Sequence, residues 1–159
     1  MTDFGQIKIA TCQFPVSESA AQNSKYIQKF LRKAKKLDSD IVHFSECALS
    51  GYAGVDFESF EDYDWPLLVE ETQKIMALAA ELQLWVILGS SHRLTEPNKP
   101  HNCLYLISPQ GHIKDRYDKR FCTESDFRWF RTFSRSFSGI IEKNPFIPPS
   151  VSSNPISLL

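Results

Sequence analysis

The fold is decided by the stretch Ile41-Val42-His43-Phe44-Ser45-Glu46-Cys47-Ala48-Leu49-Ser50-Gly51-Tyr52. Its first four residues are mostly apolar and too few for a helix, so they predict a short buried β-strand. Glu46 lies just beyond the end of that strand. Because ligands of α/β proteins bind at the carboxyl ends of strands, Glu46 is a candidate general acid or base. The alternative is a solvent-exposed loop glutamate that merely ends the strand.

Strands and helices alternate on both sides of this stretch. Further strands are predicted at residues 7–14, 84–90, 104–107 and 113–117. Helices are predicted at residues 20–37 and 66–82, where apolar residues recur at three- and four-residue spacing. Ser108-Pro109-Gln110-Gly111 predicts a tight hairpin between the last two strands. The order of strand, helix, strand, helix and three strands indicates an α/β layered fold.

The segment from residue 45 to residue 64 is long for a connection in a compact domain, which is typical of a functional loop. The aromatic side chains in and after it could line a pocket, but packing of the loop onto the body is the favoured interpretation. These aromatic residues are Phe57, Phe60, Tyr63 and Trp65.

The composition excludes several classes of function. A chain of 159 residues that is 42% hydrophobic fits one globular domain, and its net charge of −1 offers no electrostatic basis for binding nucleic acid or an anionic membrane. Neither a run of 18 apolar residues nor a signal peptide is found, so we expect a cytoplasmic protein. The four cysteines and four histidines lack metal-ligand spacing, and we predict no metal site and no cofactor.

A second candidate site residue is Lys119, in Tyr117-Asp118-Lys119-Arg120-Phe121. It follows directly on a predicted strand, as Glu46 does. A lysine beside a carboxylate in a closed site could stabilise a developing oxyanion, because a low local dielectric strengthens each charge. Taken alone, such a charged run is usually a solvated strand exit. The case depends on finding both residues at strand ends.

Four segments together make the chain resemble the N-terminal half of a carbon–nitrogen hydrolase of the nitrilase superfamily. They are Ile-Lys-Ile-Ala-Thr-Cys-Gln-Phe-Pro (7–15), Phe-Ser-Glu-Cys-Ala-Leu-Ser-Gly-Tyr (44–52), Val-Ile-Leu-Gly-Ser (86–90), and His-Asn-Cys-Leu-Tyr-Leu-Ile (101–107) continued by Gly111 and Tyr-Asp-Lys-Arg-Phe (117–121). Their order and spacing match the family over roughly residues 6–128. Two positions depart from it, since the family commonly has proline at Ser45 and often arginine at Asp118.

The resemblance implies a partial α-β-β-α sandwich of the nitrilase type that lacks its C-terminal half, and a Glu-Lys-Cys catalytic set. By position, Glu46 corresponds to the general base and Lys119 to the residue that stabilises the tetrahedral intermediate. The nucleophilic cysteine should follow a later strand. Cys122 is the last cysteine and has no apolar strand before it, so the nucleophile is absent. The family's second glutamate cannot be placed, and Glu124 is the nearest candidate.

The resemblance also implies a small-molecule amide or nitrile as substrate for a completed site, and homo-oligomers. Because half a sandwich leaves one apolar sheet face without its partner layer, this chain is expected to self-associate. Nucleic acid and membranes are not expected as partners.

The sequence changes character near residue 130. Periodicity gives way to Phe-Arg-Thr-Phe-Ser-Arg-Ser-Phe-Ser-Gly (130–139) and to four later prolines among serines. We interpret residues 1–129 as the N-terminal part of a carbon–nitrogen hydrolase domain and residues 130–159 as an irregular Ser/Pro-rich tail that is out of frame or disordered. A genuine linker or binding tail is the alternative.

Two functional hypotheses follow. In the first, the chain derives from an amidase or nitrilase that hydrolyses a non-peptide C–N bond, and it is inactive because the nucleophile is missing. In the second, it is a non-catalytic binding module or pseudoenzyme that pairs with another chain.

Overall fold

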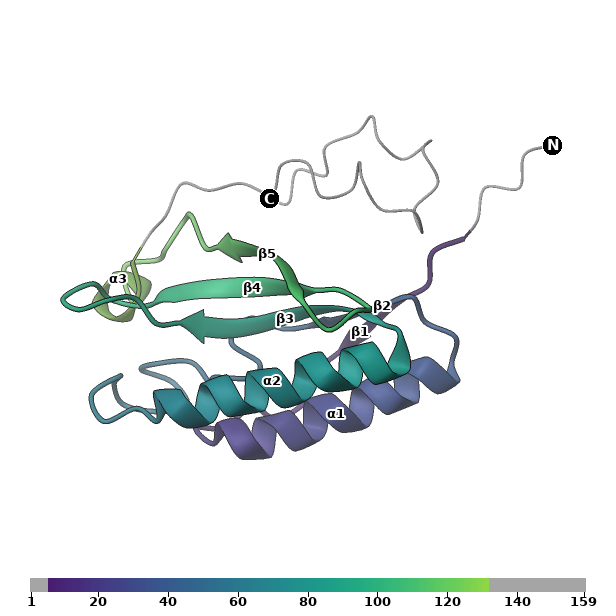
Figure 1. The fold of residues 1–159 in the computed structure, drawn as a ribbon. Helices are drawn as coiled ribbons and strands as arrows, with labels where there is room; N and C mark the ends of the chain where they lie inside the picture. The colour runs from purple at the N-terminus through teal and green to yellow at the C-terminus, as the bar shows by residue number, and fades with distance from the viewer. Residues whose placement is uncertain (1–5, 132–159) are drawn as a thin grey trace.

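The computed structural model describes residues 6–131, so the predicted tail from residue 132 onward lies outside the described residues. The elements are β1 (Ile9–Cys12), α1 (Ala20–Lys36), β2 (Ile41–Phe44), α2 (Trp65–Leu82), β3 (Trp85–His92), β4 (His101–Ile107), β5 (Ile113–Asp118) and α3 (Asp126–Trp129). They form the mixed α/β architecture that the sequence predicts (Figure 1).

One sheet with the strand order β1-β2-β3-β4-β5 forms the centre of the fold. β1, β2 and β3 pair in parallel, whereas β4 is antiparallel to both β3 and β5. Two reversals make β5 run in the same direction as β2 and β3. The carboxyl ends of β2, β3 and β5 therefore meet the amino end of β4 at one edge of the sheet, which we call the site edge.

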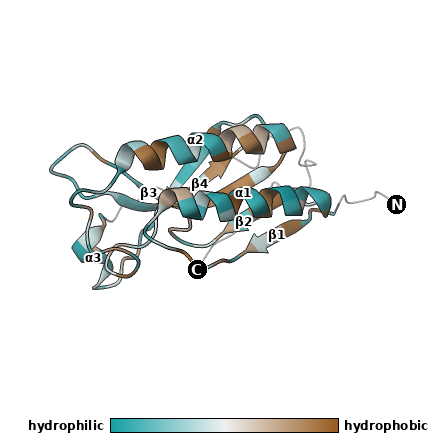
Figure 2. Ribbon diagram, turned by 90° about the horizontal axis from the view of Figure 1, so that it is seen from below, coloured by the Kyte–Doolittle hydropathy of each residue, from teal (hydrophilic) through white to brown (hydrophobic). Residues whose placement is uncertain are grey.

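Helices α1 and α2 lie side by side on one face of the sheet (Figure 1). Each connects two parallel neighbouring strands, and such crossovers are right-handed, which places both helices on the same face. The buried apolar residues of both helices pack on alternate residues of the strands. Figure 2 views the two helices from the side away from the sheet. The fully buried centre of this core comprises Ile27, Leu31, Val42, Phe44, Ile75, Leu84, Val86, Leu88 and Ile107.

The helix boundaries follow from local capping. The hydroxyl of Ser19 accepts a hydrogen bond from Gln22 N at the start of α1, and Asp64 Oδ1 accepts one from Leu67 N, 2.9 Å away, at the start of α2. At the other end of α1 the prediction extended one residue too far. Leu37 is the C-cap and is 61% exposed, so it does not belong to the buried stripe.

The largest difference from the predicted elements is at β4, which begins at His101 instead of residue 104. The sequence concealed this start because Pro100 and two polar residues precede the apolar run. His101 and Asn102 are nevertheless buried, and they pair with His92 and Ser91 of β3. This extension brings polar side chains to the site edge.

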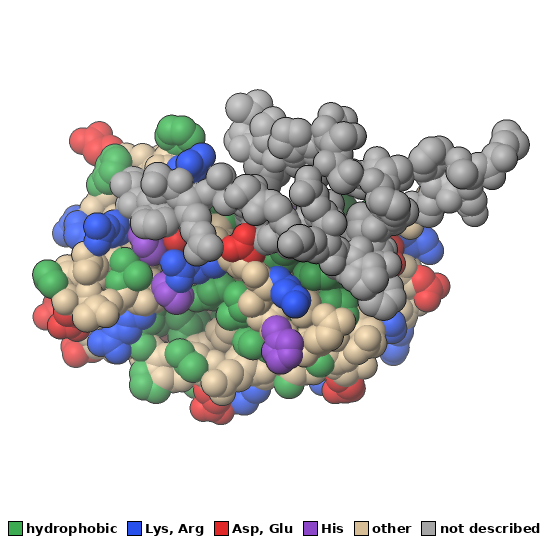
Figure 3. All heavy atoms as spheres, turned by 45° about the horizontal axis from the view of Figure 1, so that its top comes forward, with side chains coloured by type: hydrophobic (Ala, Val, Ile, Leu, Met, Phe, Trp, Pro, Cys, Tyr) green, Lys and Arg blue, Asp and Glu red, His purple; other side chains and the backbone are tan. Residues whose placement is uncertain are grey.

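The sheet face turned away from α1 and α2 carries the other set of alternating side chains. Trp85 and Ile87 of β3 and Leu104 and Leu106 of β4 belong to this set, and each is partly exposed. Hydrophobic side chains gather in the middle of the face that Figure 3 presents. The described residues thus provide one helical layer and one sheet, which is half of an α-β-β-α sandwich.

The long loop before α2 packs onto the body of the domain, as the sequence favoured. Phe57, Phe60 and Tyr63 form mutual ring contacts with centroids 5.0–5.4 Å apart, and Phe60 also stacks on Trp65. Phe57 additionally lines an open surface hollow. Among the helices of residues 6–131, none has the length and apolar character needed to cross a membrane.

The last described residues return to the site edge. Phe130 is buried against the rings of Tyr52 and Phe60. The backbone N–H of Arg131 donates to Pro100 O, 2.9 Å away, and its carbonyl oxygen lies 2.9 Å from Nδ1 of His101. The chain therefore passes directly beside the amino end of β4.

Candidate active site

Glu46 is carried by a tight turn that lies against β3. The backbone of Leu49 donates to Gly89 O across 3.0 Å, and a Cβ atom on Gly89 would lie only 2.0 Å from the carbonyl oxygen of Ser45. Only a glycine at position 89 lets the turn approach the strand this closely. Cys47 adopts φ +51°, in the left-handed region, which turns the chain sharply after Glu46.

A buried asparagine fixes the far end of the same turn. Asn23 of α1 is completely buried and donates from Nδ2 to the carbonyl oxygens of Leu49 and Ser17, at 3.1 and 2.7 Å. The backbone N–H of Ser17 donates to Asn23 Oδ1. Because buried amides must be hydrogen-bonded, this arrangement ties the turn to α1 and limits where Glu46 can lie.

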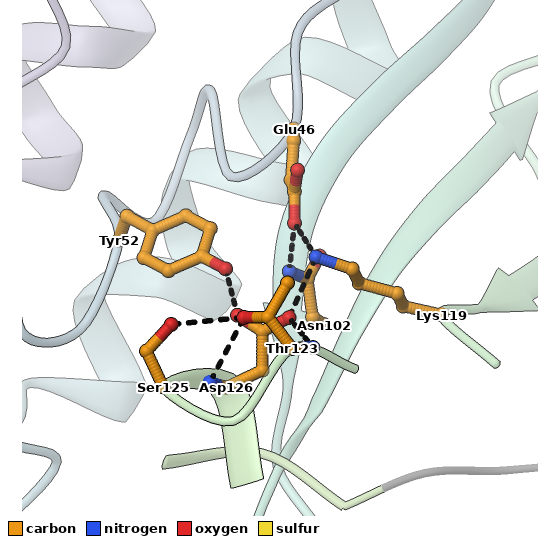
Figure 4. Close-up of polar contacts among 7 residues, drawn as sticks. All are labelled: Glu46, Tyr52, Asn102, Lys119, Thr123, Ser125 and Asp126. Carbon is orange, nitrogen blue, oxygen red and sulfur yellow. Dashed lines mark hydrogen bonds and ion pairs between the residues drawn. The ribbon is translucent and has the colours of Figure 1, made fainter. Parts of the chain in front are cut away.

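The two residues singled out from the sequence meet at the site edge. Nζ of Lys119 lies 2.8 Å from Oε1 of Glu46, although 73 positions separate them in the chain (Figure 4). The Lys119 side chain is 26% exposed and that of Glu46 45% exposed. The pair is therefore open enough to meet a small molecule, and as a partly exposed ion pair it contributes little to stability.

The site contains a second carboxylate that the sequence did not single out. Oδ2 of Asp126 lies 2.9 Å from Lys119 Nζ, and Oδ1 accepts a hydrogen bond from the Tyr52 hydroxyl (Figure 4). The side chain of Asp126 is 1% exposed. Glu124, the nearest glutamate after the lysine, is exposed instead. Asp126 starts the short helix α3, which no periodic pattern predicts, so only the search for an acid after Lys119 could have found it.

The charges of this group reinforce one another. Burial on its own would raise the pKa of Asp126, but hydrogen bonds from Lys119, Tyr52 and the Thr123 backbone outweigh it and lower this pKa to about 2. Burial would likewise lower the pKa of Lys119, yet its bonds to Asp126 and Glu46 raise it. The lysine is therefore a fixed cation held between two carboxylates.

This coupling predicts a specific acid sensitivity. Because the pKa of Asp126 is lower in the folded chain than in the unfolded chain, its contribution is present above pH 4 and is lost as the pH falls toward 2. Asp126→Asn should lower the free energy of unfolding by about 2 kcal/mol at pH 7 and flatten its decline between pH 4 and 2. Urea denaturation at several pH values measures both effects. Glu124→Gln is the control, and parallel profiles for Asp126→Asn and the unaltered chain would contradict the coupling.

None of the four cysteines has the environment of a nucleophile. Cys12, Cys47 and Cys103 are buried, and burial raises the pKa of each thiol. Cys122 is partly exposed near the site, but burial and the Asp126 carboxylate raise its pKa as well. Since the thiolate is the reactive form, these thiols are poorly suited to attack. Among residues 6–131, no group of three His, Cys, Asp or Glu side chains is arranged to hold a metal ion.

The unusual residue before the lysine has its own role. Asp118 is fully buried, and its Oδ1 lies 2.7 Å from Nε of Arg116. Strand alternation directs Asp118 and Lys119 to opposite faces. The buried Asp118 carboxylate is therefore paired with a cation of the same strand, on the face opposite to Lys119.

The family assignment rests on comparison with known proteins. The carbon-nitrogen hydrolase family model matches residues 8–140, which extends past the predicted boundary at residue 129. The chain belongs to the carbon-nitrogen hydrolase family. Omega-amidase NIT2 of Homo sapiens is 27% identical over 136 residues, covering 86% of this chain and 47% of the relative. The Mus musculus omega-amidase NIT2 is 28% identical over 129 residues, with coverages of 81% and 45%. This carbon-nitrogen hydrolase chain thus spans about half the length of these curated relatives.

Solved structures of the nitrilase superfamily share the fold. The NitN amidase from Neterenkonia sp. AN1 superimposes with a TM-score of 0.73 at 12% identity, over 82% of this chain and 51% of that one. A carbon-nitrogen hydrolase from Helicobacter pylori G27 gives a TM-score of 0.69 at 20% identity, with coverages of 82% and 46%. At these sequence identities, the structural similarity establishes the fold of the described residues.

Proposed function

We propose that the chain provides the glutamate–lysine half of a carbon–nitrogen hydrolase site, with Glu46 as general base and Lys119 as the group that stabilises the tetrahedral intermediate. The observation that carries the proposal is the 2.8 Å contact between these two side chains at the site edge. Glu46 follows β2 and Lys119 follows β5, so the two side chains come from different strand ends. The pair is also linked to a third group, the buried carboxylate of Asp126, whose Oδ2 lies 2.9 Å from Lys119 Nζ.

In the proposed reaction a cysteine from outside residues 1–159 attacks the carbonyl carbon of an amide. Glu46 takes the thiol proton as the S–C bond forms, and the Lys119 ammonium stabilises the negative charge that develops on the carbonyl oxygen. The C–N bond then breaks, and the nitrogen leaves with a proton from Glu46 as ammonia. Glu46 next removes a proton from the water that attacks the thioester, which releases the acid and restores the thiol.

Asp126 supports this scheme as the second carboxylate. A single carboxylate beside Lys119 could take its proton, whereas two carboxylates hold it charged throughout the cycle. Tyr52 and the Thr123 backbone in turn hold Asp126. We assign Asp126 the place of the family's second glutamate, which the sequence alone could not locate.

We infer that the substrate is a small molecule with a terminal amide. This rests on the omega-amidase relatives and on the open position of Glu46, which leaves room for a small molecule at the site edge. Solved structures of a related amidase contain an acrylamide or acetamide group joined to its active-site cysteine. These are small amides of the proposed class.

The test is complementation. The 159-residue chain is mixed with a separately produced, cysteine-bearing C-terminal half of a family member such as an omega-amidase, and ammonia release from small amides is measured. We expect turnover from the mixture that neither part gives alone. Glu46→Gln and Lys119→Met should abolish it, whereas the matched surface changes Glu124→Gln and Lys114→Met should not.

The outcomes separate this proposal from a binding module. If the two parts associate by light scattering but release no ammonia with any amide, the chain is a pairing module without a catalytic role. If turnover persists in Glu46→Gln, the base has been assigned wrongly.

A further inference from the structure

One residue contacts both members of the glutamate–lysine pair. Asn102, the second residue of β4, is 3% exposed and donates from Nδ2 to Oε1 of Glu46 (Figure 4). Its backbone carbonyl oxygen accepts a hydrogen bond from the backbone N–H of Lys119 across 2.8 Å. β4 lies between the strands that precede Glu46 and Lys119, so Asn102 spans the distance between them.

The two oxygens of Glu46 are not equivalent in this arrangement. Oε1 receives both the Asn102 amide and the Lys119 ammonium, whereas Oε2 accepts no hydrogen bond from residues 6–131. An ionised carboxylate offers about four acceptor positions, and those on Oε1 are engaged. Oε2 is the oxygen left with free lone pairs on a side chain that is 45% exposed.

Lys119 alone cannot hold the Glu46 side chain with Oε1 bonded and Oε2 open. Its ammonium is shared with Asp126 at 2.9 Å, and a lysine head group on a flexible stem attracts either oxygen of a carboxylate equally well. The Asn102 amide is planar, buried and carried by a strand, so it donates along one direction. Because Asn102 is buried, breaking its hydrogen bond to Glu46 is also costly, since the amide would remain buried without a partner.

We propose that Asn102 is the positioning residue of this site, and that it holds Glu46 so that Oε2 is the oxygen that receives the proton of the nucleophile. The assignment of the base rests on the proposed function. The orientation of the Glu46 side chain by Asn102 is a property of this chain and can be measured without turnover.

The first experiment uses NMR on the full 159-residue chain. In the unaltered protein the Asn102 side-chain amide protons should show contacts to the Glu46 methylenes, and the Glu46 couplings should report one rotamer. Asn102→Asp keeps the shape but places a carboxylate against Oε1, and Asn102→Leu removes the donor. In both variants we expect the Glu46 couplings to average over several rotamers. Ser91→Ala, at the β3 position paired with Asn102, is the matched control and should leave the couplings unchanged.

The second experiment measures kinetics in the complemented enzyme. A misplaced base should lower kcat on the order of 10²-fold with KM within about twofold, because the substrate still binds. Ser91→Ala should retain the kcat of the unaltered protein. A purely structural role would lower the amount of folded protein and leave the kcat per folded site unchanged.

The possible results are distinct. A single, unchanged Glu46 rotamer in both Asn102 variants would overturn the proposal, as would an unchanged kcat. If complementation gives no turnover with the unaltered chain, the proposed function fails, while the NMR couplings still decide whether Asn102 orients Glu46.

Discussion

The 159-residue chain alone should release ammonia from simple amides no faster than the buffer does. In a site whose groups act as a unit, removing the nucleophile costs on the order of 10⁶ in kcat, and none of the four thiols is placed or activated for that role. The measurement is ammonia release from small amides at neutral pH under reducing conditions, with protein purified by two unrelated affinity tags.

Cys122 provides the internal control for this prediction. Cys12, Cys47 and Cys103 are buried, whereas Cys122 is partly exposed and lies near the charged group of the site. The variant Cys122→Ser should behave like the unaltered chain. Turnover that survives purification and disappears in Cys122→Ser would contradict the prediction and identify Cys122 as a nucleophile.

Gly89→Ala should be the most damaging single-methyl substitution near the site. The added Cβ would lie 2.0 Å from the backbone oxygen of Ser45 and 2.8 Å from the backbone nitrogen of Cys47, and neither atom belongs to a flexible side chain. Overpacking a core typically costs about 1–3 kcal/mol, and a clash between two backbones belongs at or above the upper end of that range. We expect the free energy of unfolding, measured by urea denaturation, to fall by about 3 kcal/mol. The turn that carries Glu46 should also be displaced.

Ser90→Ala is the matched control on the next residue of β3. Ser90 is fully buried, and its hydroxyl has no hydrogen-bond partner within the described part of the chain. Its removal should leave the free energy of unfolding unchanged or raise it slightly, since an unpaired buried hydroxyl is unfavourable. Equal stability of Gly89→Ala and Ser90→Ala would show that the turn can move away from β3 without cost.

Much of this architecture can be predicted from the sequence because its helices and central strands carry regular apolar patterns. β2 has the same bounds in the prediction and in the structure, and α2 differs by one residue at its start. Glu46 and Lys119 could be singled out because each follows directly on a predicted strand, although the sequence did not give the strand directions that bring the two residues together. Both residues also lie in segments that resemble the family, which distinguished them as candidate site residues from the other charged residues of the chain.

The supporting residues could not be predicted in the same way. Asn102 precedes the apolar run of its strand, and Asp126 lies on a helix of four residues, too short for any periodicity. Asn23 is a polar residue of a helix, a type that is usually exposed. It is fully buried because its side-chain amide donates a hydrogen bond to the backbone of a turn that is distant in sequence. Such roles depend on tertiary contacts, which a single sequence does not display.

The position of Arg131 beside Pro100 and His101 has a consequence for local concentration. A segment joined to the chain at this point starts next to the site edge, and a short flexible connection gives it an effective concentration in the millimolar range. The same segment supplied as a separate molecule must reach that concentration in bulk solution to occupy the site equally. The effective concentration of a segment joined at Arg131 is therefore roughly a thousandfold higher than the bulk concentration of a separate partner added at micromolar concentration.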